Sequence, residues 1–270
     1  MSIGEMLSYP FAVRSLAVGL AVSCCGALLG VNLVLKKLSM LGDGLSHVSF
    51  GAAAIALAMG VAPLKISIPV VIIAAFVLVF LQSGGKLSGD AAISVISSSA
   101  LAIGIIVANL TTGMNTDINS FMFGSILAVT KGDALLCVIV SAAVLIAYIL
   151  FYNKIFCCAF DEQYAFASGV NVKFYNFLTA VLTAVTVVVG MRIMGALLIS
   201  SVITFPAISA MRICKKYRTA VILSVVVAAV TFLIGLSFSF VSDIPASAAI
   251  VVINLLVFLV FSGISKLKKI

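Results

Sequence analysis

The residues best suited to chemistry are an aspartate and a histidine that lie four positions apart in a segment with few other charges. Asp43 and His47 belong to the run GDGLSH at residues 42–47, and His47 is the single histidine of the chain. Side chains at positions i and i+4 of a helix share one face, and a carboxylate with an imidazole suits a divalent cation such as zinc or manganese. Two ligands make an incomplete site, which the same pair from a twofold-related second copy would complete.

A structural interpretation of the same pair is also open. Asp43 could cap a helix that follows Gly42, and His47 could be a polar residue whose hydrogen bonds are satisfied within a helix bundle. Whether the segment lies in water or in lipid decides between the metal-binding and the structural interpretation. In water the structural interpretation is the simpler one, whereas within a membrane ionisable side chains are costly and usually mark the path of an ion or a substrate.

Composition indicates that the solvent is lipid. Hydrophobic residues make up 64% of the 270 residues, charged residues only 9%, and the mean hydropathy is +1.36. Soluble domains carry about 25% charged residues. We therefore expect an all-α, polytopic membrane protein in which Asp43 and His47 are metal ligands. The net charge of +8 is then a sign of basic cytoplasmic loops, and not of nucleic-acid binding.

Nine apolar stretches approach the length of about 20 residues that a membrane-spanning helix needs. Eight or ten spans are the alternatives, because the connections near Pro63 and Arg192 are tight enough for broken hairpins. We see no soluble domain, and expect one transmembrane domain over residues 1–270. The nine predicted spans are 12–35, 44–62, 66–82, 91–110, 133–152, 174–191, 194–211, 219–241 and 245–264.

The distribution of cations predicts the orientation. When the loops alternate between two sides, twelve lysines and arginines fall on one side and at most four on the other. The rich side is assigned to the cytoplasm, which places the N-terminus outside and the C-terminus inside. The segment 111–132 is then external, and the segment 153–173 is cytoplasmic.

Three further groups of residues could take part in function. Asp90 begins the fourth predicted span, where it could line a path or simply cap the helix. Asn119 and Ser120 lie in the predicted external segment, where they could form a gate or contact a partner. The cytoplasmic run FDEQYAFASGV at 160–170 ends near Gly169, a helix stop signal. It predicts a short helix that docks into a partner, or else a simple linker.

The sequence lacks the motifs of several kinds of enzymatic site. Gly84, Gly85 and Lys86 lack the first glycine and the hydroxyl residue of a phosphate-binding P-loop. There is no GxSxG or HExxH motif, and the six cysteines have no metal-site spacing. We expect no ATPase site, no catalytic residues and no permanently bound cofactor.

Taken together, these segments resemble the integral-membrane permeases of the zinc, manganese and iron branch of ATP-binding-cassette importers. The resemblance covers nearly the whole chain. Ser200 and Ser201 stand where that family has more apolar residues, a departure to which we attach little weight. The resemblance is carried by DGLSH at 43–47, FGSIL at 123–127, Asp161 and Glu162 with Ala165, Ala167, Gly169 and Val170, and GALL at 195–198 with Pro206, Ala207 and Ala210.

The resemblance implies a complete transport assembly in a bacterial cell membrane. Two permease copies would form the pathway, a cytoplasmic ATPase would bind the segment from Asp161 to Val170, and an extracytoplasmic binding protein would deliver the metal. Asp43 and His47 would contribute to a metal site on that pathway. We expect zinc as the transported ion, then manganese or iron. The alternatives are a permease for a siderophore, haem or cobalamin, or a proton-coupled carrier in which the pair relays protons.

Overall fold

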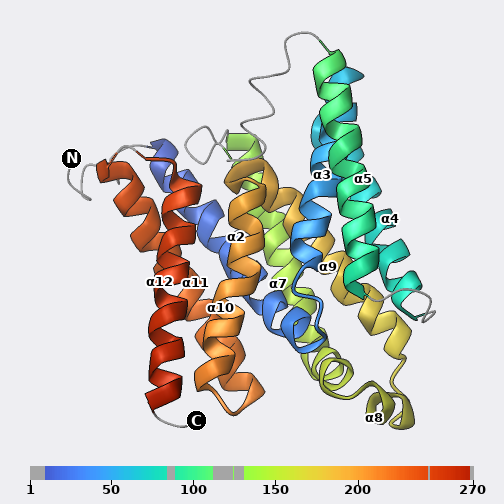
Figure 1. Ribbon diagram of the computed structural model, residues 1–270, viewed down its shortest axis with the longest axis vertical. Coiled ribbons are helices and arrows are strands. Elements are labelled where there is room, and N and C mark those ends of the chain that lie inside the picture. The colour runs from blue at the N-terminus through green and yellow to red at the C-terminus, as the bar shows by residue number, and fades with distance from the viewer. Residues whose placement is uncertain (1–9, 84–88, 112–123, 125–130, 243, 268–270) are drawn as a thin grey trace.

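The computed structural model describes residues 10–83, 89–111, 124, 131–242 and 244–267, and within them it is a bundle of helices without a β-strand (Figure 1). Nine helices of the described part are long and apolar enough to cross a membrane, which confirms the predicted number of spans. They are α2 (Pro10–Leu35), α3 (Leu41–Ala58), α4 (Pro63–Ser83), α5 (Gly89–Leu110), α7 (Lys131–Phe160), α9 (Val172–Met194), α10 (Ala196–Ile213), α11 (Tyr217–Ser242) and α12 (Ala246–Leu267), with the short α8 (Glu162–Ala167) between α7 and α9.

Two helices differ in extent from the sequence-based expectation. The α3 helix begins at Leu41 and ends at Ala58, so it starts earlier and is shorter than the predicted span 44–62. The α7 helix continues to Phe160, past the predicted end at residue 152, because no glycine or proline interrupts the helix between Asp133 and Phe160. The first part of the predicted segment 153–173 is therefore a helical extension of α7.

The α3 helix lies in the interior of the bundle, between α5 and α10. A Cβ atom at Gly51 would lie 2.5 Å from the backbone oxygen of Ala100, and one at Gly104 would lie 2.9 Å from the Cα atom of Gly51. Such glycines let two backbones approach closely, which is how helices associate in membranes. On the other side of the bundle, a Cβ at Gly30 of α2 would overlap the backbone oxygen of Ile203 in α10.

The ends of the spans alternate between two sides of the bundle. The α8 helix and the end of α12 lie at one end, and the beginning of α2 lies at the other (Figure 1). The turn between α2 and α3 faces the α8 end and carries Lys36 and Lys37. The cations of the α2–α3 turn thus lie at the same end as α8.

Candidate metal-binding site

Asp43 and His47 form a pair on one face of α3. The Nε2 atom of His47 lies 3.5 Å from the Oδ2 atom of Asp43, as their i, i+4 spacing predicts. The His47 side chain is 24% exposed and the Asp43 side chain 48% exposed on the surface of the single chain. Half of the carboxylate is therefore accessible to a further ligand or to a second subunit.

Local structure leaves the Asp43 carboxylate free of a capping role. The residue at the N-cap position is Met40, whose side chain makes no capping hydrogen bond. Asp43 lies within the first turn, where its charge is favourable toward the positive end of the helix dipole. The Ser46 hydroxyl donates to the backbone oxygen of Asp43 at 2.7 Å. The alternative in which Asp43 caps this helix is therefore wrong, because the helix begins before Gly42.

The two glycines beside Asp43 hold the turn against its neighbours. A Cβ at Gly42 would lie 2.9 Å from Cδ1 of Ile203 in α10, and a Cβ at Gly44 would lie 2.5 Å from Cγ2 of Ile93 in α5. Both distances are shorter than an ordinary contact. Gly42 and Gly44 thus pack closely against α10 and α5, which gives the Asp43 carboxylate a defined position.

The level of the pair within the bundle follows from its contacts with α10. Gly42 packs against Ile203, the eighth of the 18 residues of α10, and the Thr204 hydroxyl donates to the backbone oxygen of Ser39 at 3.5 Å. The Ser200 side chain lies near the Asp43 side chain. The pair is therefore level with the middle of α10, although it lies in the first half of α3.

One copy of the chain brings few metal donors together. Among the residues that the structure describes, no group of three or more histidine, cysteine, aspartate or glutamate side chains could hold a metal ion. Asp43 and His47 supply one oxygen and one nitrogen ligand. A tightly held metal ion needs further donors, so the donor set of one copy is half of the usual number for zinc.

The α8 helix is well defined by its ends. Asp161 is its N-cap and accepts hydrogen bonds at Oδ1 from the backbone N–H groups of Gln163 and Tyr164, at 2.9 and 3.0 Å. Gly169 follows the last turn with φ of 76°, a left-handed conformation that favours glycine. Within the segment 160–170, Ala165 and Val170 are buried and pack together with Cys158 of α7.

Most of the remaining surface of α8 is exposed. The aromatic side chains of Phe160, Tyr164 and Phe166 are each more than 60% exposed, and Ala167 and Gly169 are exposed as well. The predicted short helix is therefore present, with Ala165 on its packed face and its aromatic side chains exposed.

Glu162 of α8 forms side-chain hydrogen bonds with two other segments of the chain. Its Oε1 atom accepts hydrogen bonds from Lys36 Nζ at 2.9 Å and from Asn176 Nδ2 at 3.0 Å, and Lys36 also donates to Asn176 Oδ1. Burial acts to raise the pKa of Glu162, but the hydrogen bonds from Lys36 and Asn176 and the charge of Lys36 outweigh it, so the pKa lies below its usual value.

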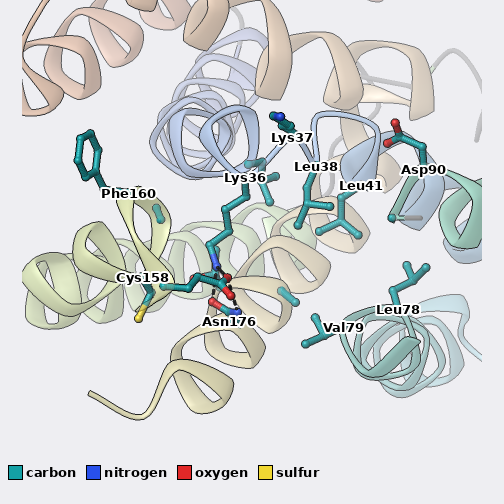
Figure 2. A pocket seen from close by; sticks show the side chains of 16 residues that line it. Lys36, Lys37, Leu38, Leu41, Leu78, Val79, Asp90, Cys158, Phe160 and Asn176 are labelled. Atoms are coloured by element: carbon teal, nitrogen blue, oxygen red, sulfur yellow. Dashed lines mark hydrogen bonds and ion pairs between the residues drawn. The ribbon is translucent and has the colours of Figure 1, made fainter. Parts of the chain in front are cut away.

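Asp90 lies apart from the Asp43 and His47 pair in a cavity at the α8 end. It belongs to the first turn of α5 and is exposed. The cavity has a volume of about 530 Å³ and is also lined by Leu41, Lys36, Lys37 and Glu162 (Figure 2). Asp90 and Leu41, the first residue of α3, thus line the same cavity. Asn119 and Ser120, the other candidates for a path or gate, lie outside the described residues.

Sequence reasoning missed two polar clusters. In the first, Lys36, Glu162 and Asn176 meet from three separate segments. In the second, the Asn32 amide donates to Tyr148 at 2.9 Å, Tyr217 donates to Asn32 at 2.7 Å, and the two tyrosine oxygens lie 2.8 Å apart. A lysine at the end of an apolar run and an asparagine inside one are the only sequence signals, and neither indicates its partner.

Comparisons with known proteins give the family of the chain. Residues 8–265 match the family described as the ABC 3 transport family. The chain is 27% identical over 255 residues to a manganese transport system membrane protein, MntC, of Listeria monocytogenes, which covers 94% of this chain and 91% of that protein. It is 28% identical over 244 residues to the high-affinity zinc uptake system membrane protein ZnuB of Haemophilus influenzae, covering 90% of this chain and 94% of that protein.

A solved structure has the same fold. PsaBC from Streptococcus pneumoniae, determined in complex with a Fab, superposes with a TM-score of 0.86 at 27% sequence identity, and the match covers 96% of this chain and 95% of that chain. The similarity therefore extends over nearly the whole length of the chain.

Proposed function

The chain belongs to the ABC 3 transport family, and we propose that it is the membrane-spanning subunit through which an ATP-driven importer passes a divalent transition-metal ion. As a member of that family it is a multi-pass cell membrane protein of the permease class. The observation that carries the proposal for this chain is the Asp43 and His47 pair, half exposed and level with the middle of α10.

The Asp43 and His47 pair is suited to a transient metal-binding site that two subunits share. Two copies related by a twofold axis contribute each residue twice, so a homodimer would offer two carboxylates and two imidazoles. Four nitrogen and oxygen donors match the usual coordination number of zinc and are also acceptable to manganese and ferrous iron. Imidazole ligands disfavour the harder calcium and magnesium ions.

The choice among the transition metals is part of the proposal. We expect zinc first, because four mixed donors at a symmetric site suit its tetrahedral preference. Manganese is the second candidate, and one of the relatives described above is named for manganese while the other is named for zinc. Affinity order alone does not set selectivity in cells, so transport must be measured with each metal.

The proposed partners follow from the two ends of the bundle. At the α8 end, the exposed Phe160, Tyr164 and Phe166 offer an apolar surface, which suits docking of α8 and the segment 153–173 into a cytoplasmic ATPase. The opposite end, where the predicted topology has few cations, would receive the metal from an extracytoplasmic binding protein. The ATPase partner supplies the hydrolysis site that this chain lacks in its sequence.

The test is transport by the assembled importer in proteoliposomes. The chain is purified with its ATPase and binding protein, and ATP-dependent uptake is measured with zinc and with manganese. Replacing the donors by Asp43→Ala or His47→Ala should lower uptake on the order of tenfold or more, because ligands and their supporting residues typically govern affinity by at least that factor. The amount of assembled complex should not change.

A matched control and two outcomes make the test decisive. Ile55→Ala alters an exposed apolar side chain farther along α3 and should leave uptake close to that of the unmodified complex. Normal transport by both donor variants would refute the metal role of the pair. Uptake that persists without ATP but requires a proton gradient would instead support a proton-coupled carrier.

A further inference from the structure

A triangle of hydrogen bonds joins α8 to the turn that carries Asp43. The Lys36 ammonium lies between the Glu162 carboxylate of α8 and the Asn176 amide of α9, and Asn176 also donates to Glu162 (Figure 2). Lys36 is only 13% exposed, whereas Glu162 is 55% exposed. A cation that is this buried needs its partner, because removing the partner leaves an uncompensated charge.

The segment between Lys36 and Asp43 is short and hydrogen-bonded. The α2 helix ends with two bonds of a Schellman motif, from Lys37 N–H to the Val34 oxygen at 3.0 Å and from Leu38 N–H to the Leu33 oxygen at 2.8 Å. Lys37 itself has a φ of 58°, a left-handed conformation that is uncommon for lysine. A turn this well defined moves as one piece with the residues at its two ends.

The turn continues directly into the metal-binding pair. Leu41 N–H donates to the Leu38 oxygen at 2.9 Å, and Gly44 N–H donates to the Met40 oxygen at 2.9 Å. In the sequence, Asp43 lies between the two donor residues, Leu41 and Gly44. Lys36 and Asp43 are therefore joined by six residues in a turn that is closed by backbone hydrogen bonds.

Space for a displacement of Lys36 is present beside the triangle. The cavity of about 530 Å³ is lined by Lys36 and Glu162, and also by Leu38, Leu41 and Asp90 (Figure 2). The main packing contacts of α8 are with α7 and α9. The ion pair with Lys36 thus joins α8 directly to the α2–α3 turn beside this cavity.

We infer that Lys36 is a positioning residue that transmits movement of α8 to the Asp43 and His47 pair. The inference rests on the proposed function, in which the ATPase docks at α8 and the pair binds the metal. When the ATPase displaces α8, Glu162 carries the Lys36 ammonium with it, and the α2–α3 turn changes the position of Asp43. ATP hydrolysis is in this way linked to the state of the metal site.

The experiment measures metal uptake and ATP hydrolysis in the same proteoliposomes, with zinc and manganese as the probes. Lys36→Met removes the positive charge of the ion pair at nearly constant side-chain length. Glu162→Gln removes the negative charge from the more exposed partner. Both should keep ATP hydrolysis while metal taken up per ATP falls on the order of tenfold, a loss within the usual range of coupling between two sites. Lys216→Met, which removes an exposed cation from the turn between α10 and α11, is the control.

The exchanged variant separates transmission from mere support. Lys36→Glu combined with Glu162→Lys restores an ion pair of reversed polarity and should recover most of the uptake per ATP. If Lys36→Met does not assemble, Glu162→Gln and the exchanged variant still decide the question.

Each remaining outcome counts against the inference. A purely structural brace would lower the yield of complex, ATP hydrolysis and uptake together, with uptake per ATP unchanged, and that result would overturn it while the proposed function stands. Absence of ATP-dependent uptake by the unmodified complex would overturn both.

Discussion

The contact between Gly44 and Ile93 offers a sharp test of how the metal pair is held. A Cβ atom at Gly44 would lie 2.5 Å from Cγ2 of Ile93, whereas ordinary contacts begin at 3.4 Å. The methyl belongs to a β-branched side chain with restricted χ1, so α3 and α5 must separate. Overpacking of this kind costs about 1–3 kcal/mol. Gly44→Ala should therefore lower the melting temperature of the purified chain and reduce metal uptake, since Asp43 is the preceding residue.

A second substitution, at Ile93, should restore the stability that Gly44→Ala removes. Ile93→Leu moves the branch point away from the backbone and removes Cγ2 at constant volume, so the combination of Gly44→Ala with Ile93→Leu should regain most of the lost stability. Gly263→Ala is the matched control, because a Cβ there meets nothing within 4 Å and alanine favours a helix. The reasoning is refuted if Gly44→Ala melts like the unmodified protein, or if Ile93→Leu gives no recovery.

Two further predictions concern the polar clusters. Tyr217→Phe removes the hydroxyl that donates to Asn32 and contacts Tyr148, and it should destabilise the chain by about 1–2 kcal/mol, the usual size for two hydrogen bonds within a membrane. Thermal melting checks this, with Tyr152→Phe as a neutral control. The lowered pKa of Glu162 means that its ionised form stabilises the folded state at neutral pH, and that this stabilisation is lost as the pH falls below 4.5 through the pKa of the folded protein. The melting difference between the unmodified chain and Glu162→Gln should therefore disappear in acid.

The number of spans was predictable because each one must satisfy its own backbone hydrogen bonds in lipid. That requirement is local, and it is written in runs of apolar residues. The ends of helices were less predictable. The α3 helix begins before Gly42, although two glycines beside Asp43 suggested a later start, because packing against Ile93 and Ile203 outweighs the weak helix preference of glycine.

The residues around the candidate site show the same division. The i, i+4 spacing predicted that Asp43 and His47 share a face, and they do. Ser200 carried little weight in the sequence, yet it lies near Asp43 in the fold. Lys36 counted only as one cation of a basic loop, whereas in the fold it joins Glu162 and Asn176. Such meetings depend on contacts between residues more than 100 positions apart, which no local pattern records.

The sequence by itself determined that the chain is a polytopic membrane protein, and it predicted nine spans, with eight or ten as alternatives, and one helix face shared by its one histidine and an aspartate. It left the depth of that pair open, because a position near the end of a span reads as a position near the membrane surface. The tertiary structure decided the matter. The start of α3 is wedged against the middle of α10 through Gly42 and Ile203, and Ser39 there accepts a hydrogen bond from Thr204. Close packing of small residues can thus place the beginning of a short helix in the interior of the bundle. Only the contacts with the partner helix show this position.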